Sequence, residues 1–367
     1  MTNPASPFRA PKTVARLAEA LAAAMEGLPP ARVMHVCGTH EHEIGRYALR
    51  QLLPDNLEVI AGPGCPVCIT PASAIVTAAE IAKGDPNRIL CAYGDILRVP
   101  TERGSLADAK AAGADVRLVY GPPDAIRLAR ENPSRQVVFF SVGFETTAAP
   151  VAALLQGEVP GNFLVYTCHR YVPGAVRALV EIDPESLDGF LLPGHACVIT
   201  GSEAYRFIPE EFGGHAAVAG FEPADILLGI LALARQIRDN RSDVENCYPR
   251  VVHEAGNTKA QAALGEVFEL GAASWRGIGT LPETGLELKG KHRRLDALER
   301  LGIEEIQAED IMPGCSCHLV MLGKRTPAEC PLFRKQCAPA APRGPCMVGM
   351  EGTCHAWYQH GSGKSLD

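Results

Sequence analysis

Cys65 and Cys68 form a CxxC pair within the segment GPGCPVC at residues 62–68. The apolar run LEVIA just before it predicts a buried strand that ends in a Gly-Pro-Gly turn, and a helical pattern opens after Thr70. The two thiols therefore lie between the carboxyl end of a strand and the amino end of a helix. Because the helix dipole favours thiolate over thiol there, the pair is suited to redox chemistry or to binding a soft metal. The alternative is two buried cysteines in a tight turn.

A third cysteine, Cys37, also follows a short apolar run and begins the segment CGTHEHE. The carboxyl ends of parallel strands meet at one edge of a sheet, where ligands bind. We therefore expect Cys37, Cys65 and Cys68 to converge on one cleft, with His40 and Glu41 nearby. Three thiolates suit iron or zinc, and a site with only three protein ligands keeps a coordination position open. A redox dithiol is the other interpretation of the CxxC pair, and the two are compatible at different stages.

Composition restricts the class of protein. The chain has 367 residues, of which 47% are hydrophobic and 21% charged, with a net charge of -7. This acidic balance argues against a nucleic-acid partner and against a membrane surface. The first seven residues lack the apolar segment of a signal peptide, and the longest apolar run, 226–234, is too short to span a bilayer. We therefore expect a cytoplasmic protein, in which thirteen cysteines indicate metal or redox chemistry rather than disulfides.

Six of those cysteines lie close to the carboxyl terminus and predict a small cysteine-held unit. Their spacing matches neither a zinc finger nor the bacterial ferredoxin run. Proline and glycine around the cysteines still suit a loop wrapped on an iron–sulfur cluster, which needs four thiolates. Spacing does not choose four ligands among the six, and unligated thiols are the alternative. The six are Cys315, Cys317, Cys330, Cys337, Cys346 and Cys354.

Two further loops carry polar side chains at strand ends. Glu145 belongs to GFETT at 143–147, where a helix cap is the plain structural interpretation. His195 belongs to PGH at 193–195, where a packed histidine competes with a cleft residue. Neither loop fits a phosphate-binding motif.

The elements that must position these residues follow a βαβ rhythm. About eight apolar runs alternate with helical patterns, which predicts parallel sheets covered by helices on both faces. The expected class is α/β, with two Rossmann-like domains and a small iron–sulfur domain. The expected units are 12–117 carrying Cys37, Cys65 and Cys68; 118–240 with the GFETT and PGH loops; 241–310, unassigned, with a return to the first unit left open; and 311–367, the cysteine-rich domain.

Together these motifs resemble the HypD family of [NiFe]-hydrogenase maturation proteins. The similar stretches follow one another along nearly the whole chain, with one departure after PGH, where Ala196 and Cys197 replace a Val-Ser or similar polar pair. The stretches are CGTHE (37–41), GPGCPVC (62–68), GFETT (143–147), PGH (193–195), WRGIG (275–279), CPLF (330–333), GPCMV (344–348) and EGTC (351–354).

The resemblance implies a scaffold on which the Fe(CN)2(CO) unit of the hydrogenase is assembled. HypC would bind this protein with the iron held between them, Cys37 being the leading ligand. HypE would deliver cyanide as a protein-bound thiocyanate. Cys65 and Cys68 correspond to the redox-active or iron-binding pair of the family, beside a carboxyl-terminal [4Fe-4S] cluster that could pass electrons to the dithiol. As cluster ligands we choose Cys315, Cys330, Cys337 and Cys346, with Cys317 and Cys354 as alternates.

The candidate catalytic residues are Cys65, Cys68, His40, Glu41, Glu145 and His195. Two other functions stay open. A dithiol/disulfide oxidoreductase like ferredoxin–thioredoxin reductase would need only Cys65, Cys68 and the cluster, and would tolerate the loss of Cys37. A zinc-held structural or interaction protein would contain zinc without iron or sulfide.

Overall fold

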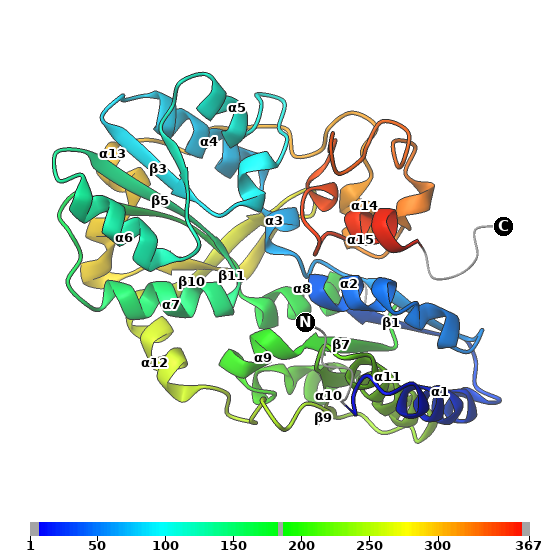
Figure 1. Cartoon of the computed structure of the whole chain (residues 1–367). Coiled ribbons are helices and arrows are strands. Elements are labelled where there is room, and N and C mark those ends of the chain that lie inside the picture. The colour runs from blue at the N-terminus through cyan, green and yellow to red at the C-terminus, as the bar shows by residue number, and fades with distance from the viewer. Residues whose placement is uncertain (1–6, 183–185, 362–367) are drawn as a thin grey trace.

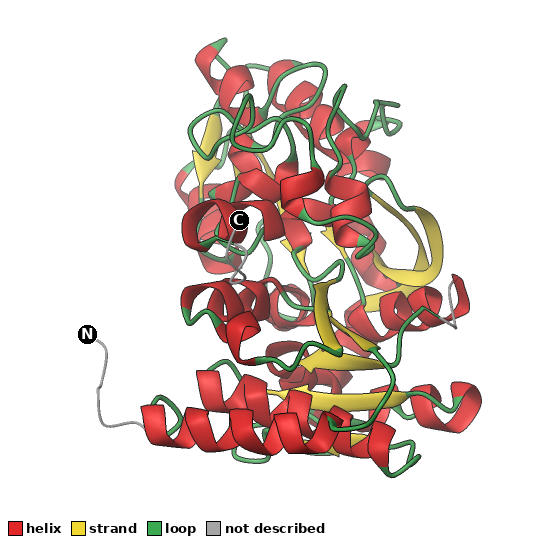
Figure 2. Cartoon of the chain, turned by 90° about the vertical axis from the view of Figure 1, so that its right-hand side faces the viewer, coloured by secondary structure: helices red, strands yellow, loops and turns green. Residues whose placement is uncertain are grey.

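Two parallel β-sheets and a cysteine-rich tail make up the protein (Figure 1). A computed structural model describes residues 7–182 and 186–361. The expected α/β class is confirmed, because helices lie on both faces of each parallel sheet (Figure 2). Within the described residues, no helix is both long and apolar enough to cross a bilayer.

The first sheet carries the Cys37 and CxxC loops at its strand ends. Its order is β2-β1-β7-β8-β9, with all neighbours parallel and Ala31 aligned with Leu57. Helices α1 and α11 cover one face, while α8, α9 and α10 cover the other. The strands are β1 (Ala31–His35), β2 (Leu57–Ala61), β7 (Gly189–Pro193), β8 (His215–Ala219) and β9 (Val244–Asn246). The helices are α1 (Pro11–Met25), α8 (Val172–Ile182), α9 (Gly194–Thr200), α10 (Phe207–Phe212) and α11 (Pro223–Arg238).

The second sheet has the order β4-β3-β5-β6 and is also parallel. Its longest strand, β5, is an almost continuous apolar run, as expected for a strand buried on both faces. Helices α6, α7 and α12 pack on one face, and α4, α5 and α13 on the other. The strands are β3 (Arg88–Ala92), β4 (Val116–Leu118), β5 (Gln136–Gly143) and β6 (Phe163–His169). The helices are α4 (Ala72–Lys83), α5 (Leu106–Ala111), α6 (Pro122–Glu131), α7 (Glu145–Leu155), α12 (Thr258–Val267) and α13 (Ala297–Leu301).

The expected boundary at 117/118 does not separate the two sheets. Strands β1 and β2 pair with β7, β8 and β9 from later in the chain, whereas β3 and β4 join β5 and β6. The chain therefore crosses from the first sheet to the second and back again. A βαβ pattern predicts strands and helices, but the same pattern is compatible with either sheet, which is why the sequence suggested a simple division into halves.

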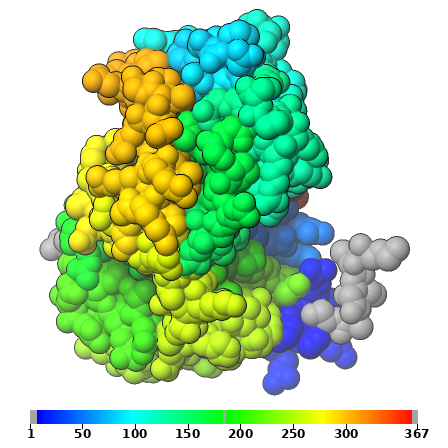
Figure 3. Space-filling model, turned by 90° about the vertical axis from the view of Figure 1, so that its left-hand side faces the viewer, coloured from blue at the N-terminus to red at the C-terminus, as the bar shows by residue number. Residues whose placement is uncertain are grey.

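The segment 241–310 is shared between the sheets: its first strand, β9, pairs with β8 of the first sheet, and the part from α12 to α13 packs on the second sheet. Its antiparallel hairpin, β10 (Phe268–Trp275) and β11 (Gly279–Leu288), and the helices α12 and α13 pack against that sheet. Figure 3 shows this segment in yellow and orange, running along one face of the molecule. Of the expected unit 311–367, residues 362–367 lie outside the described part of the chain. The rest forms α14 (Cys317–Met321) and α15 (Thr353–His360), close to α2 (Gly38–Arg46) and α3 (Pro66–Ile69) in Figure 1.

Two glycines allow direct backbone contacts among three segments: the Cys37 loop, the CxxC loop and the tail. A Cβ on Gly64 would overlap the backbone of Val36 and Cys37, and a Cβ on Gly38 would overlap the backbone oxygen of Glu351. The backbone N–H of Gly38 also donates to the carbonyl of Gly64 at 3.0 Å. A larger residue at either position would therefore separate the segments that carry the cysteines.

We predict that Gly64→Ala destabilises the fold by about 3 kcal/mol, because the added methyl group has to displace backbone atoms rather than a flexible side chain. Urea unfolding measures this free energy. The matched control is Gly161→Ala, since a Cβ there meets nothing within 4 Å. Equal stability of the two variants would show that the loops are not in this close contact.

Candidate functional site

Seven cysteines from the CxxC loop and the tail lie in one buried apolar cluster. Trp275 of the hairpin, Met321 of α14 and Met347 pack around them. The CxxC loop contributes its cysteines from the first turn of α3, where Cys65 is the N-cap residue. The thiols of two distant parts of the sequence are therefore brought together away from water. The seven are Cys65, Cys68, Cys315, Cys317, Cys337, Cys346 and Cys354.

The thiol of Cys346 is the link between the tail and the CxxC pair. It has hydrogen-bond interactions with the thiols of Cys317, Cys354 and Cys68. Cys68 in turn interacts with the thiol of Cys65. An unbroken set of thiol contacts therefore runs from the CxxC loop into the tail.

The other tail cysteines differ in their contacts. The Sγ atoms of Cys315 and Cys317 are 3.2 Å apart, and both face Gly344, where a Cβ would overlap them. Cys337 accepts a hydrogen bond from the backbone N–H of Arg343 at 3.3 Å. Cys330 is buried but does not belong to the apolar cluster. The predicted ligand set of Cys315, Cys330, Cys337 and Cys346 is thus only partly in mutual contact, and it stays a prediction.

Burial and neighbouring thiols disfavour thiolates in this cluster. Burial is the main cause that raises the pKa of Cys68 well above the ordinary value, and the Cys346 thiol together with burial raises the pKa of Cys354. Cys68 and Cys354 are therefore neutral at pH 7 unless a positive charge lies next to them. Among the described residues, no group of three or more His, Cys, Asp or Glu side chains is arranged as a ready metal-ion site.

Cys37 is the N-cap residue of α2 and lies outside the apolar cluster, with Gly64 packed against its backbone. Burial raises its pKa to about 12, although hydrogen bonds from the backbone of His40 and Thr39 act in the opposite direction. Those two N–H groups belong to the first turn of α2 and act to lower the pKa of Cys37, so they favour a thiolate once a cation approaches. The loop contact between Gly38 and Gly64 sets Cys37 beside the CxxC loop.

Glu41 anchors the tail to the strand and helix that carry Cys37. Its carboxylate accepts hydrogen bonds from Arg50 at 2.7 and 3.0 Å and from Trp357 of α15 at 2.8 Å, and it lies 2.6 Å from the ring nitrogen of His35. Burial alone would raise the pKa of Glu41, but the charge of Arg50 and the hydrogen bond with His35 hold it well below its usual range. Both oxygens are engaged in this anchoring, which the sequence did not indicate.

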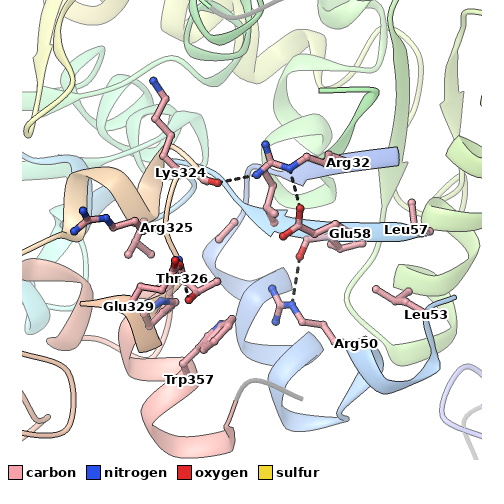
Figure 4. Close-up of a pocket in the computed structure, with 17 residues that line it drawn as sticks. Arg32, Arg50, Leu53, Leu57, Glu58, Lys324, Arg325, Thr326, Glu329 and Trp357 are labelled. Carbon is pink, nitrogen blue, oxygen red and sulfur yellow. Dashed lines mark hydrogen bonds and ion pairs between the residues drawn. The ribbon is translucent and has the colours of Figure 1, made fainter. Parts of the chain in front are cut away.

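Figure 4 shows the pocket beside this anchor, between the edge strand β2 and the tail. Arg50 and Trp357 enter it from opposite sides, and Arg32 bridges Glu58 and the backbone of Gly323. These contacts attach the tail to the edge of the first sheet.

The rings of His40 and His195 both pack on Phe221, a residue that sequence reasoning missed. The ring of His195 stacks on Phe221 with centroids 3.8 Å apart, and the ring of His40 packs on it at 4.9 Å. His40 is fully buried and bonded to the carbonyl of Gly220 at 2.9 Å, and burial lowers its pKa to about 3. It is therefore a neutral, packed side chain at pH 7. Phe221 followed a predicted strand end, but an aromatic residue alone carried no chemical signal.

Glu145 joins the helices of the two sheets. It lies at the start of α7, fully buried, and its Oε1 accepts a hydrogen bond from the backbone N–H of Val172 in α8 at 2.6 Å. Its Oε2 has no partner among the described residues. Burial raises the pKa of Glu145 to about 8, so the carboxyl group keeps its proton at pH 7. It is not part of the cysteine cluster.

This raised pKa predicts a pH-dependent stability. Between the unfolded pKa near 4.5 and the folded value of about 8, the folded state holds a proton that the unfolded state releases. Stability from this group is therefore present at low pH and is lost as the pH rises, at up to about 1.4 kcal/mol per pH unit. Glu145→Gln cannot ionise, so we expect it to gain about 2 kcal/mol over the wild type between pH 5.5 and 7.5.

Urea unfolding at the two pH values checks this expectation. Glu304→Gln, which changes an exposed carboxyl group, is the matched control and should follow the wild type. Parallel pH profiles for wild type and Glu145→Gln would contradict the buried, protonated state.

Comparison with known proteins gives the family. The profile named HypD, described as the hydrogenase formation hypA family, matches residues 12–361. The chain is 42% identical over 368 residues to hydrogenase maturation factor HypD2 of Bradyrhizobium diazoefficiens, covering 97% of this chain and 96% of that protein. It is 44% identical to HypD of Escherichia coli K12 and 43% identical to HypD of Rhodobacter capsulatus, covering 96% of this chain and at least 95% of each relative. As the motifs suggested, this chain belongs to the HypD family.

Proposed function

We propose that this protein serves hydrogenase maturation as a scaffold and redox protein on which the Fe(CN)2(CO) unit is assembled. HypC is the proposed partner that shares the iron, and HypE is the proposed donor of cyanide. One observation carries the proposal. The CxxC thiols interact with the tail thiols, and the Cys37 loop packs against Gly64 of the same CxxC loop.

Iron is the cargo in this proposal, and Cys37 is its leading ligand. The N–H groups of Thr39 and His40 at the start of α2 act to lower the pKa of Cys37 and so support its thiolate form. A metal ion removes the thiol proton outright, which overcomes the raised pKa that burial imposes. One protein thiolate leaves most of the coordination sphere free for diatomic ligands and for a ligand from HypC.

The CxxC pair supplies the two electrons that release of cyanide from a thiocyanate requires. Splitting a thiocyanate R–S–CN into the thiolate R–S⁻ and cyanide takes two electrons. The thiolates of Cys65 and Cys68 provide both as they form a disulfide, and the freed cyanide passes to the iron. Returning the disulfide to two thiols takes two electrons and two protons, and one-electron transfer is the chemistry that a [4Fe-4S] cluster supplies when bound.

The tail cysteines fit such a cluster by the chemistry of their donors. Thiolates are the usual ligands of iron–sulfur clusters, and here they lie in an apolar environment. The lack of a side chain at Gly344 lets the sulfurs of Cys315 and Cys317 pack against its backbone. The contacts of Cys346 with Cys317 and Cys354 support counting both alternates among the possible ligands, alongside the proposed set of Cys315, Cys330, Cys337 and Cys346.

We expect Cys37→Ala to abolish hydrogenase maturation in cells that have no other copy of this protein, because the iron loses its leading ligand. Hydrogenase activity of the cell extract is the measurement. Cys91→Ala is the matched control, since Cys91 is equally buried but lies in the second sheet. Unimpaired maturation with Cys37→Ala would refute the scaffold and favour the stand-alone dithiol oxidoreductase.

We expect protein purified without oxygen to contain about four iron and four sulfide ions per chain, as a [4Fe-4S] cluster requires. Replacing each tail cysteine with serine in turn then identifies the ligands, since a ligand variant loses iron and its visible absorbance. Cys168→Ser, a buried thiol outside the cluster of seven, is the control. Zinc in place of iron and sulfide would contradict the cluster.

A further inference from the structure

Arg276 is a buried charge whose hydrogen-bonding capacity is largely unused. It lies in the turn between β10 and β11, and only 1% of the residue is exposed. Neither Nε nor Nη1 has a hydrogen-bond partner among the described residues. Its Nη2 reaches the carbonyl of Pro100 at 3.5 Å, which is long for a hydrogen bond. Burying a guanidinium group with unpartnered N–H donors costs free energy of folding, so the position of Arg276 calls for an explanation.

The carboxylate of Asp310, which forms a distant ion pair with Arg276, does not account for the buried charge. Asp310 lies 4.0 Å from Nε, too far for a hydrogen bond. Its two oxygens instead accept the backbone N–H groups of Ala72 and Gly277, at 2.8 and 2.9 Å. Asp310 is therefore occupied mainly in holding the hairpin turn against the start of α4.

The tail thiols lie within electrostatic reach of the guanidinium group. Burial lowers the pKa of Arg276, while negative charge on Asp310, Cys317, Cys315 and Cys346 would raise it. In the other direction, the charge of Arg276 acts to lower the pKa of Cys315. These mutual effects mean that Arg276 is close enough for its charge to be felt at the sulfur atoms.

The backbone holds this charge in place. The N–H of Arg276 donates to the carbonyl of Ile69 in α3 at 2.9 Å, directly after the CxxC pair. The neighbouring Trp275 packs inside the cysteine cluster, where its indole N–H donates to Thr284 at 2.9 Å. Arg276 is thus fixed between the dithiol and the tail. The nearby Arg325, which bonds to Ser316 at 3.2 Å, is by contrast exposed to water, where its charge is screened.

From this arrangement we propose that Arg276 is the buried counter-charge of the sulfur centre formed by the tail, and that it raises the reduction potential of that centre. The inference rests on the [4Fe-4S] cluster of the proposed function. A cluster held by four thiolates is anionic, and its one-electron reduction adds one more negative charge without breaking a bond. A fixed positive charge at low dielectric favours the more negative state. The unpartnered N–H groups are also the donors that sulfur ligands of a cluster accept.

The test is a redox titration of the full-length protein, purified without oxygen and monitored by electron paramagnetic resonance. Arg276→Met removes the charge and keeps the length of the side chain. We expect its ratio of oxidised to reduced cluster to rise at least tenfold at the same applied potential, which is a downward shift of about 59 mV for a one-electron couple. Arg276→Lys keeps the charge and should restore most of the shift.

Arg170→Met is the matched control. Arg170 is also buried with an unpartnered Nε, and it contacts the same hairpin through the carbonyl of Ser274 at 2.8 Å. Its charge acts on Cys168 rather than on the tail thiols. We expect the titration of Arg170→Met to stay within about twofold of the wild type in that ratio, whatever its effect on stability.

Each outcome decides the matter. If the wild type holds a cluster and the cluster of Arg276→Met has the same reduction potential, the inference is overturned and the proposed function is left intact. A wild type without iron and sulfide would overturn the proposed cluster, and the inference with it. If Arg276→Met folds by circular dichroism but holds no cluster, Arg276→Lys decides: iron retained against a chelator supports the role of charge, and iron lost from both variants overturns it.

Discussion

Three separate segments of the chain meet through direct backbone contact, with no side chain between them. This close approach allows the three segments to contribute to one site. Gly64 packs on the backbone of Cys37, and Gly38 packs on the backbone of Glu351 in the tail. The chain crosses from one sheet to the other and back between Gly38 and Glu351, whereas Cys37 and Gly64 follow neighbouring strands of the first sheet. The cysteine-bearing loops are close because these backbones are close.

Two buried arginines have different roles. Arg50 anchors the tail, and Arg276 tunes the reduction potential of the proposed sulfur centre. Arg50 is fully paired, with two hydrogen bonds to Glu41, and the resulting network attaches α15 to the helix that carries Cys37. Such a buried and satisfied pair fixes geometry. Arg276 is left largely unpaired beside the thiols, so its charge is available to the sulfur centre. The difference between them is visible only in their hydrogen bonds.

The sequence predicted the eight strands of the two parallel sheets up to β8 and the cysteines that matter, because apolar runs and CxxC spacing are local signals. It could not predict which strands share a sheet, since β1 pairs with both β2 and β7 from quite different distances along the chain. The anchoring role of Glu41 depends on Trp357, more than 300 residues away, and was equally hidden. Arg276 stood in a motif that the resemblance identified, but only burial revealed its unpaired charge.

The CxxC pair and the tail thiols form one connected unit, with Cys346 as the link. The most direct measurement is disulfide mapping by mass spectrometry of a Cys65→Ser variant, mildly oxidised after removal of iron. With its natural partner gone, Cys68 should form a disulfide with Cys346, because their thiols are in contact. A Cys68 that remains free, or that pairs with a cysteine outside the cluster such as Cys168, would contradict the account.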